Sequence, residues 1–94
     1  MGGIQSINPE ELRHALVHLL DAAALPCPED GLLVKRTVGR SGAMGYVVIA
    51  TNGAEALIDK VIYCATHRDK ASLSGIWVLS SQHALQLLEY AATH

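Results

Sequence analysis

The order of hydrophobic and polar residues predicts a helix over residues 9–25. Apolar residues recur there at three- and four-residue spacing, which is typical of a helix with one buried face. They are Leu12, Leu16, Leu19, Leu20 and Ala23. Asn8 and Pro9 suit the cap and the first helical position, and Glu11 is placed to complete a capping box. Because Pro26 disfavours helical geometry in the preceding residue, we expect the helix to end near Leu25.

Two strands are predicted next, over Leu32–Val38 and Tyr46–Ala50. The second is rich in β-branched residues and almost continuously apolar, which favours a strand buried within a sheet. The segment between them, Gly39–Gly45, has a glycine at every third position. A glycine-containing link between two strands predicts a hairpin, here with a long and flexible tip.

The second half of the chain predicts two helices around one strand. Asn52 is a candidate cap with Glu55 three residues later, and the apolar face of this helix is formed by Leu57, Ile58, Val61, Ile62 and Ala65. Gly75–Ser80 is predicted to be a third strand, apolar on both faces. A serine at 80 or 81 caps the last helix, whose apolar residues are Ala84, Leu85, Leu88, Ala91 and Ala92.

These elements predict one α/β (α+β) domain over residues 1–94, in the order α-β-β-α-β-α, with residues 1–7 as a flexible N-terminal tail. The strand–helix–strand unit from Tyr46 to Leu79 is expected to be a right-handed crossover with parallel strands. With an antiparallel hairpin before it, the sheet would be a small three-stranded mixed sheet covered by three helices. Its edges would lie close to its centre, and an exposed edge favours pairing with another chain.

The composition predicts a partner surface. Half of the residues are hydrophobic and 17% are charged, whereas an average globular protein has about 25% charged residues. A domain of 94 residues has a modest core, so part of this apolar surface is expected to be exposed, as it often is at binding surfaces. We therefore expect a homo-oligomer, most simply a two-fold dimer, or another protein partner.

The charge distribution gives an alternative, although the net charge is −2. Acidic residues predominate before residue 31 and basic residues between 31 and 75. The candidates for contact with nucleic acid or an acidic partner are expected on one side of the domain: Lys35, Arg36, Arg40, Arg68 and Lys70. The glycine-rich link beside them is not a phosphate-binding loop, because it joins two strands and no helix N-terminus follows it. The overall acidity counts against nucleic acid, since phosphate contacts dominate such binding.

Two histidines of the first predicted helix have the spacing of metal ligands. His14 and His18 are one helical turn apart and could share a metal ion with Asp21. The alternative is a solvated polar face opposite the leucine stripe, and no third histidine completes the set, so no metal or cofactor is expected.

The possible nucleophiles are not part of a recognisable catalytic motif. Cys64 and His67 are three residues apart, but Cys64 borders an apolar face, where a buried and inert thiol is expected. Ser80, Ser81 and His83 lack a nucleophile elbow, and capping accounts for the serines. We therefore expect no catalytic residues.

The element order resembles that of the restriction-endonuclease-like nucleases, and Lys70–Ala91 is similar to their last strand and helix. That family has a carboxylate on one strand and a carboxylate- or glutamine-x-lysine motif on the next. Residues 46–51 contain neither a carboxylate nor a lysine, and the chain is one strand shorter. The resemblance therefore implies at most a catalytically inactive relative that binds nucleic acid.

The expected location is cytoplasmic. The N-terminus lacks a basic region followed by a long apolar run, and no stretch is long enough to span a membrane. Cys27 and Cys64 have neither CxxC nor metal-site spacing. The leading prediction is a non-enzymatic interaction or regulatory domain that acts through protein–protein contacts as a homodimer. A nucleic-acid-associated module is the alternative, and a small metal-dependent enzyme is a third.

Overall fold

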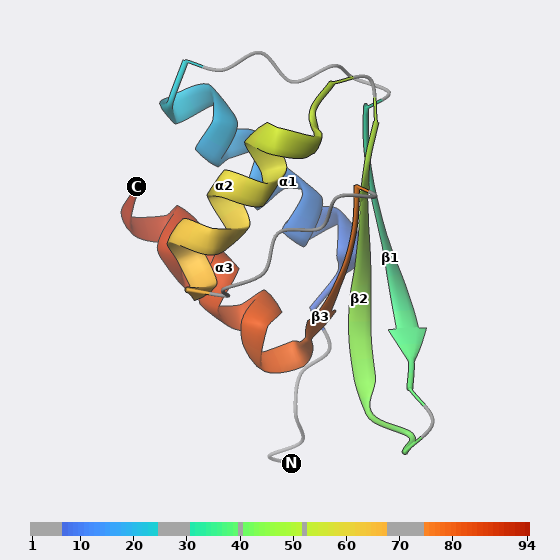
Figure 1. The fold of residues 1–94 in the computed structure, drawn as a ribbon. Helices are drawn as coiled ribbons and strands as arrows, with labels where there is room; N and C mark the ends of the chain where they lie inside the picture. The colour runs from blue at the N-terminus through green and yellow to red at the C-terminus, as the bar shows by residue number, and fades with distance from the viewer. Residues whose placement is uncertain (1–6, 25–30, 40, 52, 68–74) are drawn as a thin grey trace.

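The computed structural model describes residues 7–24, 31–39, 41–51, 53–67 and 75–94, and these form a sheet with helices on one side. The elements are α1 (Pro9–Ala22), β1 (Leu32–Val38), β2 (Met44–Ala50), α2 (Glu55–Thr66), β3 (Ile76–Ser80) and α3 (Ser81–Thr93). The predicted order α-β-β-α-β-α and the α+β class are confirmed. Figure 1 shows the three helices together on one face of the three-stranded sheet, so the fold has two layers.

The sheet is antiparallel throughout, in the order β1-β2-β3. The predicted parallel pairing of the last two strands, and with it the mixed sheet, is therefore wrong. The backbone N–H of Ala50 donates to the carbonyl of Gly75 at 2.8 Å, so β3 begins beside the end of β2 and runs back along it.

Chain length explains the antiparallel return. The 12 residues of α2 carry the chain about 18 Å away from the end of β2. Segment 68–74, whose structure lies outside the described residues, can span about 25 Å when extended. The chain can therefore return to the end of β2 before β3 starts, which a short helix-to-strand link could not do.

The hairpin between β1 and β2 is shorter at its tip than predicted. The N–H of Gly39 donates to the carbonyl of Ala43 at 2.8 Å, and β2 already begins at Met44. Gly45 is thus part of the strand. A Cβ at that position would lie 2.8 Å from the carbonyl oxygen of Leu79, so the close approach of β3 requires glycine there.

The start of α1 is as predicted, and its end comes earlier. The Oδ1 of Asn8 accepts a hydrogen bond from the N–H of Glu10 at 2.9 Å, with proline in the first turn. The predicted leucine stripe is buried: Leu12, Leu16, Leu19 and Leu20. The helix ends at Ala22, because Ala24 already has a φ of +58°. Ala23, predicted to be part of the stripe, is consequently exposed.

The predicted cap of α2 is wrong, and that of α3 is confirmed. The N-cap of α2 is Ala54, without a side-chain cap bond. Ala54 is 1% exposed and its N–H donates to the carbonyl of Thr51 at 3.1 Å, so burial and a backbone turn fix this helix start; Asn52 itself lies outside the described residues. In α3, Ser80 Oγ accepts from the N–H of His83 at 3.1 Å. Here Leu87 is buried in place of the predicted Leu85, which is exposed.

Tyr46 connects the sheet to the segment before α1. Its ring is 1% exposed, and its hydroxyl donates to the carbonyl oxygen of Ile7 at 2.7 Å. Arg36 Nη2 donates to the same oxygen at 3.3 Å. Ile7, the last residue of the predicted tail, thus packs against the core; residues 1–6 lie outside the described ranges.

We expect Tyr46→Phe to lower the free energy of unfolding by about 1 kcal/mol, the usual net value of a partly buried hydrogen bond. Urea denaturation followed by circular dichroism measures the change. Tyr63→Phe is the matched control, because the Tyr63 side chain is half-exposed and should leave the midpoint unchanged. Equal midpoints for the two variants would show that the Tyr46 hydroxyl contributes nothing.

Candidate interaction surface

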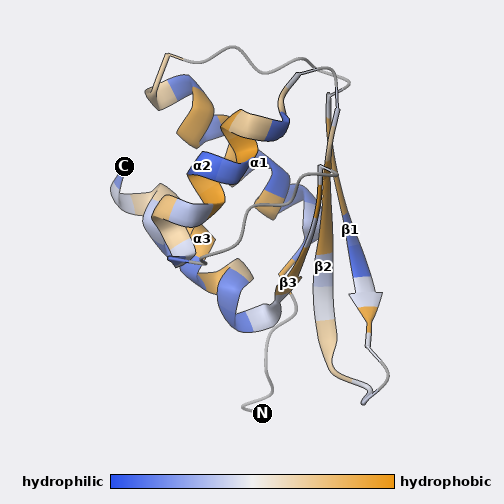
Figure 2. Cartoon of the chain, viewed as in Figure 1, coloured by the Kyte–Doolittle hydropathy of each residue, from blue (hydrophilic) through white to orange (hydrophobic). Residues whose placement is uncertain are grey.

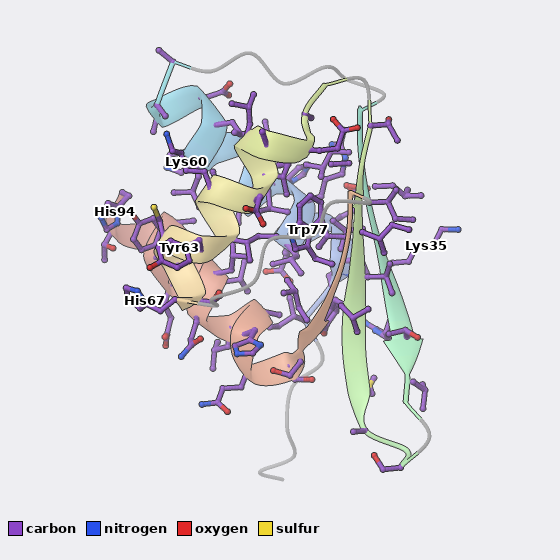
Figure 3. All side chains as sticks on the ribbon, viewed as in Figure 1. Lys35, Lys60, Tyr63, His67, Trp77 and His94 are labelled. Carbon is purple, nitrogen blue, oxygen red and sulfur yellow. The ribbon has the colours of Figure 1, made fainter. Side chains whose placement is uncertain are left out.

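The strand register assigns the sheet residues to two faces. Residues directly opposite one another on neighbouring strands share a face. Val34, Val48 and Trp77 form one such row, and all three are buried. Figure 3 shows Trp77 pointing from β3 toward the helices, where its Nε1–H donates to Oδ1 of Asp59 on α2 at 3.2 Å. This inner face is the floor of the core.

The opposite face carries aliphatic side chains that the helices do not cover. One row is formed by Leu33, Ile49 and Ile76, and the next by Lys35, Val47 and Val78. Leu33 is 45% exposed, Ile76 48% and Val78 62%, while Val47 and Ile49 on the central strand are half-buried. We call these six residues the outer sheet face.

The outer sheet face is continuous across all three strands. Figure 2 shows hydrophobic residues along most of β2 and β3 and one hydrophilic stretch in β1. A two-layer antiparallel sheet usually alternates apolar residues toward the core with polar residues toward solvent. Here both faces are apolar. A binding partner that covered the outer face would remove its aliphatic side chains from water, which is energetically favourable.

The two described residues of the basic set lie on opposite faces. Lys35 belongs to the outer sheet face and points away from the helices (Figure 3). Arg36 is paired with the buried Tyr46, and its guanidinium donates to the Ile7 carbonyl on the helix side. The other predicted contact residues, Arg40, Arg68 and Lys70, lie outside the described residues. The expected placement on one side is therefore wrong for Lys35 and Arg36.

The candidate metal ligands on α1 are solvent-facing. His14, His18 and Asp21 are all exposed, and His14 Nε2 lies 3.8 Å from Oε1 of Glu10. Both histidines border a shallow, open depression between α1 and α3, whose floor is mainly alanine and leucine. Within the described ranges, no three histidine, cysteine or carboxylate side chains are grouped to hold a metal ion.

The predicted nucleophile candidates lie on α2 and α3 or at their ends. Cys64 is exposed, so the expectation of a buried thiol is wrong; it lies beside the buried stripe of α2 (Ile58, Val61 and Ile62), not in it. His67 ends α2 with a φ of +57°, and its ring packs edge-on against Tyr63 at 6.3 Å between centroids. Ser81 Oγ donates to the carbonyl of Met44 at 3.0 Å, which joins α3 to the start of β2.

A pocket of about 300 Å³ between the helices was not predicted from the sequence. Its walls are mainly aliphatic, and its polar side chains are Lys60, Cys64, Tyr90 and His94. The His94 ring stacks on Tyr90 at 3.8 Å between centroids, and its Nδ1 lies 2.9 Å from the Tyr90 carbonyl oxygen. His94 is thereby held against the end of α3, and the part of the chain described contains no hydrogen bond between Cys64 and either Lys60 or His94.

The outer sheet face is the surface that sequence reasoning missed, although strand alternation contained a signal for it. Successive strand residues point to opposite faces, and Leu33, Val47 and Val78 each lie between two buried residues of their strand. Which of the two alternating sets of strand residues the helices cover is not encoded locally.

No helix within the described residues is long and apolar enough to cross a membrane. The chain matches no known family model, no curated protein and no solved structure.

Proposed function

We propose that this protein is a non-enzymatic protein–protein interaction domain and that the outer sheet face is its binding surface. The observation that supports the proposal is the aliphatic surface across the three strands, on which Leu33, Ile76 and Val78 of the two edge strands are exposed and the residues of the central strand are half-buried. Burying apolar surface yields about 25 cal/mol per Å², so a partner that covers this face gains favourable binding free energy.

The shape of the surface favours a protein partner over a small molecule. Small ligands bind in concave sites that enclose most of their surface, whereas the outer face of a sheet is broad and has no walls. A second protein layer can cover it completely, in the way that two sheets pack face to face about 10 Å apart.

The test is photo-crosslinking from the surface itself. With Val78 replaced by p-benzoylphenylalanine, ultraviolet irradiation in extracts of the native host should produce protein adducts, and excess unlabelled wild-type protein should suppress them. The same substitution at Leu85 is the matched control, because Leu85 is similarly exposed but lies on α3. Equal labelling from both positions would refute the outer sheet face as a binding surface.

A further inference from the structure

We infer that the occupant of the outer sheet face is a second copy of this chain, packed sheet against sheet about a two-fold axis parallel to β2. This inference rests on the proposed function and specifies the partner. A homodimer covers both apolar faces with one symmetric contact, and two-fold dimers are the commonest oligomers of proteins.

The low charge of the outer sheet face favours a second copy of this chain as the partner. The described acidic residues are all on helices: Glu10, Glu11, Asp21, Glu55, Asp59 and Glu89. Lys35 is the single charge on the outer sheet face, at the edge strand β1. A binding surface for nucleic acid or an anionic membrane needs several cations. An aliphatic centre with one cation at its rim is instead complementary to another aliphatic face.

The rows of the outer sheet face match themselves under this symmetry. Rotation about an axis parallel to β2 keeps each row at its level and exchanges β1 with β3. Leu33 then lies opposite the partner's Ile76, and Ile49 opposite its own counterpart. In the next row Lys35 lies opposite the partner's Val78. Its aliphatic stem can cover that valine while the ammonium group extends past the edge into solvent.

The same axis keeps the two lysines apart. The edge strands are about 10 Å apart across a three-stranded sheet, and packed sheets are about 10 Å apart. The two Lys35 residues would therefore be separated by roughly 14 Å, which exceeds the Debye length of about 8 Å at physiological ionic strength. Their repulsion is largely screened.

The area is sufficient for a modest dimer. Strand spacing and the rise over the five residues of β3 give the outer side of the sheet a footprint of roughly 14 Å by 17 Å, and side-chain relief about doubles the accessible surface. The pair would bury on the order of 1,000 Å², near the lower limit for a specific interface. We therefore expect a weak dimer that forms at high concentration and dissociates on dilution.

The decisive experiment is sedimentation equilibrium of the wild-type chain and three variants from about 1 to 500 µM. Wild type should associate to a dimer. Val78→Lys should weaken association at least about tenfold, because each new ammonium group faces the partner's Lys35. Val78→Glu should dimerise at least about fivefold more tightly than Val78→Lys, since it faces the same lysine with opposite charge. Leu85→Lys, on α3, should behave as wild type.

A second measurement needs no variant. In wild-type NMR spectra recorded over the same concentrations, amide shifts of Leu33, Val47 and Val78 should move with dilution, while those of the exposed α1 residues His14 and His18 should not. Movement confined to the helices would overturn the inference, as would equal association of the lysine and glutamate variants at position 78.

The two proposals can fail separately. A wild-type chain that stays monomeric at 500 µM overturns the homodimer, and photo-adducts from position 78 with a different protein would leave the proposed function standing. Adducts of twice the chain mass support both. An absence of position-specific adducts together with a monomeric chain refutes both.

Discussion

Gly75→Ala should lower the free energy of unfolding by about 3 kcal/mol, an effect that combines a strained backbone with a steric clash. Gly75 has a φ of +76°, in the left-handed region that costs other residues about 1 kcal/mol or more. A Cβ there would lie 2.6 Å from the carbonyl oxygen of Ala50 and 2.9 Å from Cγ of Glu55. The backbone oxygen cannot move away freely, because Ala50 also donates its N–H to the Gly75 carbonyl at 2.8 Å.

Gly53→Ala is the matched control for that change. Gly53 also has a positive φ, of +85°, but a Cβ there would meet no atom within 4 Å. Its alanine variant should lose only about 1 kcal/mol, partly offset by the reduced entropy of the unfolded chain. Urea denaturation of both variants isolates the clash as their difference. Equal losses would mean that the β2–β3 junction relaxes around the added methyl group.

Leu16→Ala should lower the free energy of unfolding by about 3 kcal/mol, within the range for large-to-small changes in a protein core. Leu16 is fully buried on α1, which packs against α3, β1 and α2. Its truncation removes transfer free energy and leaves a cavity that three elements would have to move to fill. In a domain of this size the loss should lower the melting temperature by at least about 12 °C.

Leu85→Ala is the control for the core substitution. Leu85 is 49% exposed on α3, so the same chemical change there should alter stability by no more than about 0.5 kcal/mol. A small effect at Leu16, similar to that at Leu85, would contradict the assignment of the α1 stripe as the centre of the core.

Core and surface substitutions should therefore separate folding from association. Leu16→Ala should change the stability of the monomer, whereas Val78→Lys should weaken the proposed dimer and leave the stability of dilute protein close to wild type. Because a dimer stabilises the folded state by mass action, the melting temperature of the wild-type chain should rise with concentration. That rise should be lost in Val78→Lys and retained in Leu85→Lys.

The sequence alone determined the features that depend on neighbouring residues. Leucine spacing in α1 specified its buried face, and Asn8 and a serine at 80 or 81 specified two helix caps. Each of these depends on interactions within one turn of helix, which a local pattern encodes.

Only the tertiary structure decided the direction of β3 and the identity of the exposed face. The continuous apolarity of β2 predicted burial on both sides, yet all three helices lie on one side and leave Val47 and Ile49 facing outward. The start of α2 at Ala54 likewise depends on burial against distant residues. These outcomes are set by how the connections return and which surfaces meet in space, and contacts between residues far apart in sequence leave no periodic trace along the chain.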